Sequence, residues 1–194
     1  MVSTTPTHRR TITLESFDGD GEVTITATLT DERPWADGET LTQSVHDMTL
    51  TVVVDRRRGV IDRANADMRR FPHRECPSIE PAVRSLAGIS VSRGYNKAVA
   101  EVLGRQRGCT HLEFLARAVG PMVIQAMAST AARQAGPAGI GEVVREDVGG
   151  WLTNTCHLWA DGGVGAAKLA EGWRPGVDEY PAPLLVDIRR REPS

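Results

Sequence analysis

The chain lacks three features: a long apolar run, a dense set of cysteines and an excess of one charge. No apolar run is long enough to cross a bilayer, so a membrane-spanning protein is not expected. The 23 basic and 25 acidic residues leave a net charge of −2, which gives no electrostatic reason to bind nucleic acid or a membrane surface. The 3 cysteines, an odd number, do not resemble a disulfide framework. The sequence has no internal repeat.

The first residues also lack the apolar core of a signal peptide. Because Met1–Arg10 is polar, we expect a cytoplasmic protein. In a reducing compartment the cysteines are free thiols, metal ligands or nucleophiles, unless they pack as small hydrophobic residues. A hydrophobic content of 40% and a charged content of 25% are ordinary for a soluble globular protein. A chain of 194 residues is long enough for one well-buried domain with an appended subdomain.

The first half of the sequence predicts an antiparallel β-meander. Apolar and polar residues alternate in several short segments, which is typical of half-buried strands. Asp18–Gly21 and Asp55–Gly59 carry turn residues, and Asp31–Glu39 reads as a polar loop. The predicted strands are Thr11–Leu14, Val23–Leu29, Met48–Val54 and Val60–Ala66.

The second half predicts helices. Apolar residues recur at helical spacing after Ser78, after Tyr95 and, over the longest stretch, after Thr110. Strands followed by helices predict an α+β domain with the helices packed on one sheet face. Glycines and a proline in Gln134–Gly141 indicate a flexible break. We therefore expect a core over residues 1–134 and a C-terminal extension or lid over 135–194, packed on the same domain.

The most informative motif is Gly108–Glu113 at the start of the longest predicted helix. Thr110 is a good N-cap, and Glu113 completes a capping box. Cys109 then lies just before the cap, and His111 lies in the first turn. The positive end of a helix stabilises a thiolate. A thiolate beside an imidazole is either a pair of metal ligands or a nucleophile with its base.

The order of these motifs resembles the iron–sulfur cluster scaffold family (IscU/NifU type). That family has a ligand loop, a strand, a turn ending in glycine, a return strand, a second cysteine, two helices and a last cysteine opening a long helix. Here the run His46–Asp55, then Gly59–Ala64, Cys76 and Cys109–Leu112, follows the same order, and the resemblance covers Met48–Ala128. The chain is also similar to a group of bacterial proteins that carry His-Asp-Met and Gly-Cys-Thr-His-Leu. Membership of that group implies no activity.

The chain departs from the scaffold pattern at three places. Ser44 and His46 stand near the position of the first scaffold cysteine, and Gly108 stands where the family has a histidine. Gly104–Arg107 lacks the proline-rich segment on which a chaperone docks in that family. A shared fold with a different role is therefore expected.

The resemblance implies a metal site at one end of the sheet, where the predicted loops and the helix start meet. We predict His46, Cys76, Cys109 and His111 as metal ligands, with Asp47 and His111 moving protons. Thiolates and imidazoles suit Zn²⁺, and an added aspartate suits Fe²⁺. The competing interpretation is an exposed histidine and two packed cysteines.

Two classes of function follow. The first is a metal-dependent enzyme of the lyase, hydrolase or isomerase type, acting on a small organic substrate through metal-bound water or a metal-polarised carbonyl. The alternative is a non-catalytic carrier or adaptor in iron–sulfur or metal metabolism. A metal-free catalyst using Cys109 and His111 is a third option. The aromatic stretch Trp151–Trp159, which contains Cys156 and His157, favours an enzyme because it reads as a lid. No nucleic-acid or membrane partner is expected, and a homodimer is compatible with the sequence.

Overall fold

The structure is a computed structural model that describes residues 4–36, 43–92, 94–143, 153–154, 156–165 and 167. The side chains of 132 and 135–143 are not among the described features. The chain divides into two compact units, Met1–Met127 and Ala128–Ser194. No helix in the described part is both long and apolar enough to cross a membrane.

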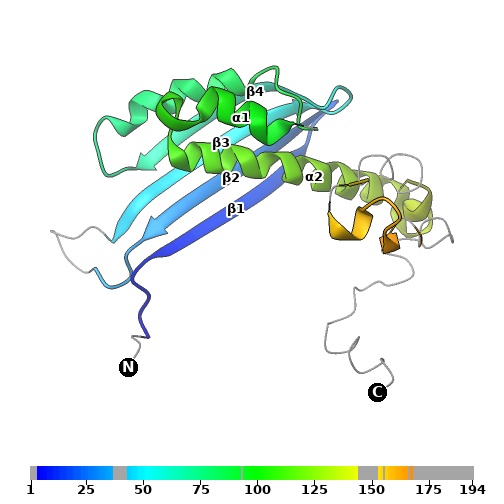
Figure 1. The fold of residues 1–194 in the computed structure, drawn as a ribbon, viewed down its shortest axis with the longest axis horizontal. Helices are drawn as coiled ribbons and strands as arrows, with labels where there is room; N and C mark the ends of the chain where they lie inside the picture. The colour runs from blue at the N-terminus through cyan, green and yellow to red at the C-terminus, as the bar shows by residue number, and fades with distance from the viewer. Residues whose placement is uncertain are drawn as a thin grey trace. The chain divides into compact units, whose positions relative to one another are not determined.

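The first unit is built on a four-stranded antiparallel sheet in the order β1-β2-β3-β4 (Figure 1). This arrangement confirms the predicted meander, including the pairing of Met48–Val54 with Val60–Ala66. The strands extend beyond the alternating segments because polar residues at their ends also join the hydrogen-bond ladder. The strands are β1 (Arg9–Asp18), β2 (Glu22–Glu32), β3 (Ser44–Asp55) and β4 (Val60–Arg70).

The end of β2 differs from the sequence-based expectation. Asp31 and Glu32 belong to the strand rather than to a loop. Asp31 pairs with Arg10 of β1 and with His46 of β3. Aspartate is a poor strand former in isolation, but oppositely charged and hydrogen-bonding neighbours across the sheet compensate for its low propensity.

Helices cover one face of the sheet, which confirms the α+β class (Figure 1). The 3₁₀ helix η1 (Cys76–Leu86), the helix α1 (Tyr95–Leu103) and the first part of α2 (Thr110–Val143) supply the apolar residues on that side. The short 3₁₀ turn η2 (Arg105–Arg107) joins α1 to α2. The strands contribute alternate positions to the core, whose fully buried side chains include Ile25, Leu29, Leu50, Val52, Leu86, Leu103, Leu112 and Leu115.

The long helix contradicts the predicted break at Gln134–Gly141, because α2 continues without interruption to Val143. A glycine in a helix costs only about 1 kcal/mol and a proline about 3 kcal/mol. An existing helix also extends without a new nucleation step. The division between the two compact units falls between Met127 and Ala128. The core over residues 1–134 with an extension over 135–194 stays a prediction.

Little of the predicted C-terminal lid is described. Trp151, Leu152 and residues 168–194 lie outside the described residues. In the second unit, the 3₁₀ turn η4 spans His157–Trp159, and Cys156 is exposed.

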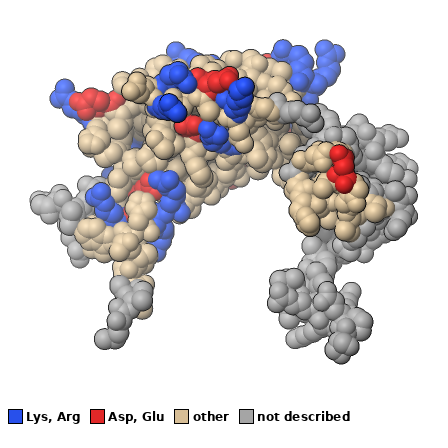
Figure 2. All heavy atoms as spheres, in the orientation of Figure 1, with Lys and Arg blue, Asp and Glu red and all other residues tan. Residues whose placement is uncertain are grey.

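Charges on the first unit are largely paired. Arg63 binds Glu22 at 2.9 Å and Arg58 binds Asp62 at 2.7 Å between side-chain nitrogen and oxygen. On the face shown in Figure 2, acidic groups lie beside basic ones. This mixing agrees with the near-zero net charge of the sequence.

Candidate functional site

The candidate site is centred on Asp31, near the C-terminal end of β2. Its side chain is 1% exposed and lies on the core face, where every second residue of β2 is buried. It is the one buried charged side chain among the described residues. A buried carboxylate is costly unless hydrogen bonds and opposite charges compensate for its lost hydration.

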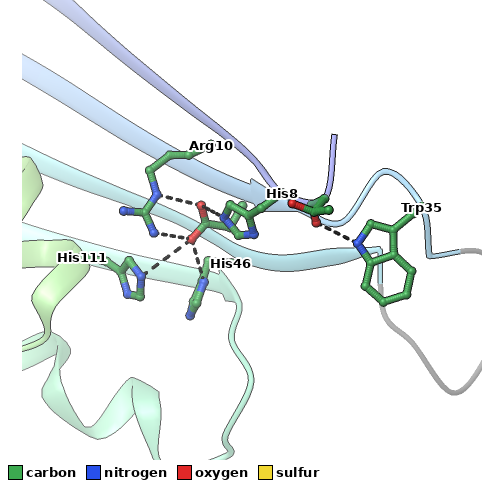
Figure 3. Close-up of polar contacts among 7 residues, drawn as sticks. His8, Arg10, Trp35, His46 and His111 are labelled. Carbon is green, nitrogen blue, oxygen red and sulfur yellow. Dashed lines mark hydrogen bonds and ion pairs between the residues drawn. The ribbon is translucent and has the colours of Figure 1, made fainter. Parts of the chain in front are cut away.

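Strand β1 and the residues before it supply two of the partners. The guanidinium of Arg10 donates from Nε to Oδ1 and from Nη2 to Oδ2 of Asp31, both at 2.7 Å. Nε2 of His8 lies 3.0 Å from Oδ1. His8 and Arg10 reach the same carboxylate because side chains two positions apart along an extended chain share a face. Figure 3 shows both converging on it.

Two histidines approach from the other side of the carboxylate (Figure 3). His46 lies opposite Asp31 on β3, and its Nδ1 is 2.9 Å from Oδ2. His111 lies in the first turn of α2, and its Nε2 is 3.7 Å from the same oxygen. The imidazole centroids are 4.1 Å apart, with the ring planes tilted by 42°.

These contacts determine the charges at the centre. Burial alone would raise the pKa of Asp31, but hydrogen bonds from Arg10, His8 and His46, together with the charge of Arg10, hold it well below its ordinary value. Burial lowers the pKa of His111, as do the charges of His46 and Arg10, while Asp31 opposes the shift. At neutral pH Asp31 is therefore anionic, and His111 is neutral with a lone pair available.

His111 also contacts Cys109. Its Sγ lies 3.7 Å from Nδ1 of His111, the ring nitrogen that does not face Asp31. The carbonyl of Cys109 accepts the N–H of Glu113 at 2.8 Å, so Cys109 itself occupies the N-cap position predicted for Thr110. Cys109 thus holds one edge of the imidazole while the carboxylate faces the other.

Asp31, His46 and His111 could hold a metal ion. Each offers one ligand atom, and the three atoms lie within 4.8 Å of one another. Two imidazoles and one carboxylate form a donor set used by Zn²⁺ and by non-haem Fe²⁺. If Nε2 of His111 bound a metal, its Nδ1 would carry the proton and would donate a hydrogen bond to Sγ of Cys109. The second ring nitrogen of a metal-bound histidine commonly donates such a bond to a neighbouring group.

The structure brings together only part of the predicted ligand set. His46, His111 and Cys109 lie in one cluster. Cys76 begins η1 and packs against the hydrophobic core, and no hydrogen bond joins it to the cluster among the described residues. Asp47 points to the opposite sheet face, where it binds Arg69 with 3.0 Å between Oδ2 and Nε. Adjacent residues in a strand point to opposite faces, so His46 and Asp47 do not share a site.

Sequence reasoning missed the residue at the centre of the cluster. The polar composition of Asp31–Glu39 predicts a loop there, although the alternation of β2 continues to Asp31 at every second position from Val23. His8 and Arg10 were missed because β1 begins earlier than the apolar residues of that segment indicate. Continued alternation was the available signal for Asp31, whereas nothing local marks His8.

Comparison with known proteins identifies a family. A family model described as "Protein of unknown function (DUF2889)" matches residues 8–125, more than half of the chain. The chain therefore belongs to the DUF2889 family. The matched segment contains every residue of the Asp31 cluster. No curated protein and no solved structure matches the chain.

Proposed function

We propose that this member of the DUF2889 family binds a divalent metal ion through Asp31, His46 and His111 and acts with it on a small organic substrate. The observation that carries the proposal is the convergence of three ligand atoms within 4.8 Å around a buried, anionic carboxylate. Zn²⁺ and Fe²⁺ are the ions that this donor set suits. A metal there would polarise a carbonyl or activate a water molecule.

The residues of the cluster have distinct roles in this proposal. Asp31 contributes the negative charge, and His46 and His111 contribute ring-nitrogen ligands. Cys109 orients His111 through the ring nitrogen that the metal does not use. Asp47 has no part, because its ion pair with Arg69 lies on the other face of the sheet. Lyase, hydrolase and isomerase reactions all fall within this chemistry.

The test is metal content, measured on protein purified without a metal-affinity tag and then reloaded with Zn²⁺ or, without oxygen, Fe²⁺. The wild-type chain is expected to bind one ion. His46→Ala and His111→Ala should lose it, because two ligands rarely retain a metal. His157→Ala, a histidine of η4, is the matched control and should bind as the wild type does. Wild-type protein that takes up neither ion would refute the proposal.

A second candidate is a metal-free cysteine catalyst. The chain of contacts from Cys109 Sγ to Nδ1 of His111, and from Nε2 of His111 to Oδ2 of Asp31, measures 3.7 Å at each step. This is the arrangement of a nucleophile, its base and an orienting carboxylate. His111 would take the thiol proton as the sulfur attacks a carbonyl carbon, and the π electrons of the carbonyl would move to its oxygen.

Alkylation by iodoacetamide, followed by peptide mass spectrometry, distinguishes this candidate. In metal-free protein, His111→Gln should slow the alkylation of Cys109 several-fold if the histidine activates it. Cys156, which is exposed, serves as the internal standard. Equal alkylation rates at Cys109 in the two proteins would argue against an activated nucleophile.

The carrier or adaptor role stays a prediction, as do the resemblance to IscU/NifU-type scaffolds, the cytoplasmic location and the homodimer. A carrier differs from an enzyme in giving up its cargo. Transfer of bound metal to a second apo-protein, without turnover of any small molecule, would favour the carrier over the enzyme.

A further inference from the structure

Arg10 donates a hydrogen bond to the oxygen of Asp31 that would bind the proposed metal. Its Nη2 donates to Oδ2 of Asp31 at 2.7 Å, the same oxygen that His46 contacts at 2.9 Å and that His111 faces at 3.7 Å. A dication bound between the two imidazoles and Oδ2 would therefore lie close to the guanidinium. Two cations at such a distance repel each other strongly in a partly buried site.

The charge of a metal-loaded cluster would not be balanced by the protein. Asp31 is the only acidic side chain among the described residues that contacts Arg10, His46 or His111. Its single negative charge is already matched by Arg10. Imidazole ligands bring no negative charge, so the full double charge of a bound dication stays uncompensated, and a buried excess of charge requires a counter-ion.

Arg10 is placed to hold such an anion. Its Nη1 has no hydrogen-bond partner among the described residues, and its side chain is 38% exposed, in contrast to the 1% of Asp31. A guanidinium has a planar fork that matches two oxygens of a carboxylate. The contact with Asp31 already shows this two-point geometry at 2.7 Å in both bonds.

We infer that the substrate of the metal-loaded site carries a carboxylate, which Arg10 binds beside the metal. This inference rests on the proposed metal site. Arg10 then has two roles: it neutralises Asp31 in the metal-free protein and becomes a specificity-determining residue when a dication takes Oδ2. The exposed side of the guanidinium gives the ligand a route from solvent.

The experiment uses the full-length chain loaded with Co²⁺, whose visible spectrum reports ligands entering the metal site. Acetate is the probe, acetamide is its neutral counterpart, and methylphosphonate represents the other common anion. Arg10→Gln is expected to weaken acetate binding by about tenfold, the loss expected for one charge-assisted hydrogen-bonded contact. The same variant should bind Co²⁺ more tightly, since the competing cation is gone.

Arg9→Gln is the matched control, because Arg9 precedes Arg10 on β1 and its nearest acidic partner is Glu32, at 3.5 Å. It should bind acetate and Co²⁺ as the wild type does. Arg10→Lys keeps the charge without the fork and should weaken acetate binding several-fold, which provides a test if Arg10→Gln does not fold.

The outcomes separate the two proposals. Wild-type protein that takes up no Co²⁺ overturns the proposed function and this inference with it. Co²⁺ uptake with the same acetate affinity in Arg10→Gln and wild type overturns the inference alone. Tighter binding of methylphosphonate than of acetate overturns the assignment of the ligand as a carboxylate. Binding of acetamide with the same affinity as acetate overturns it as well.

Discussion

At the scale of single residues, the position of Asp31 on the core face of β2 explains why several polar side chains gather at one place. A buried carboxylate must be compensated, and the neighbouring strands present Arg10 and His46 directly opposite it. The helix α2 adds His111 from above the sheet. The polar neighbours therefore compensate for the burial of the Asp31 charge, and they also form a candidate set of metal ligands.

Asp31→Asn tests that requirement. The amide keeps the shape but removes the charge that Arg10 and the histidines compensate, so the free energy of unfolding should fall by about 2 kcal/mol. Asp47→Asn is the matched control on the opposite face, and loss of its partly exposed ion pair should cost below about 1 kcal/mol. Urea unfolding followed by circular dichroism measures both. Equal losses in the two variants would contradict a special role for the buried carboxylate.

The pKa of His111 predicts how stability depends on pH. In the folded chain, the pKa of His111 is lowered by burial and by the charges of His46 and Arg10, and Asp31 opposes this shift only in part. Below about pH 6.5 the unfolded chain therefore takes up a proton at His111 more readily than the folded protein does. The contribution of His111 to the free energy of unfolding is thus complete above that pH and is lost as the pH falls. The pKa of Asp31 is also lowered, so the free energy of unfolding falls further when the pH drops below about 3.9.

The measurement is urea unfolding of metal-free protein at about pH 7.5 and about pH 5.5. The wild type should be less stable at the lower pH, and His111→Gln should show a smaller difference between the two. An unchanged pH dependence in His111→Gln would contradict the assignment.

At the scale of elements, the start of α2 depends on a close backbone approach at Gly108. A Cβ at this position would clash with the carbonyl oxygen of Leu103, at the end of α1. Any side chain at position 108 would meet the same clash. Gly108 therefore permits the tight connection from α1 through η2 that sets Cys109 and His111 at the sheet.

Gly108→Ala should force this connection apart. We expect a fall of about 1–3 kcal/mol in the free energy of unfolding, typical of overpacking, together with loss of metal uptake as His111 moves. Gly19→Ala, where the added carbon would meet only ordinary contacts at 3.7 Å, is the control and should change stability by less than about 0.5 kcal/mol. Normal metal uptake by Gly108→Ala would show that the connection tolerates the methyl group.

At the scale of the whole molecule, the hydrophobic core and the cluster both lie within the unit Met1–Met127. The core residues run from Val23 to Ala126, and none of those described comes from the second unit. A fragment ending at Met127 should therefore fold and should unfold cooperatively. It should also take up as much metal as the full chain does. Thermal unfolding of this fragment, beside one ending at Gln134, checks the expectation. An unfolded shorter fragment would show that residues beyond Met127 are required.

Much of the fold could be predicted because its signals are local. Alternation gave the strands of the meander, and helical spacing gave the helices after Ser78, Tyr95 and Thr110. The errors occurred where local signals compete with their surroundings. Asp31 and Glu32 are poor strand formers that cross-strand partners hold in β2, and Gln134–Gly141 holds helix breakers that continue an existing helix.

The sequence by itself determined the α+β class, the order of the strands and the placement of His111 at a helix start, because each depends on residues close together in the chain. Only the tertiary structure decided the composition of the cluster. Alternation along β2 can place Asp31 on the core face, but its partners come from β1, β3 and α2, and no local pattern encodes their convergence. The pleat of β3 likewise turns His46 toward the cluster and Asp47 away from it, since one step along a strand reverses the face.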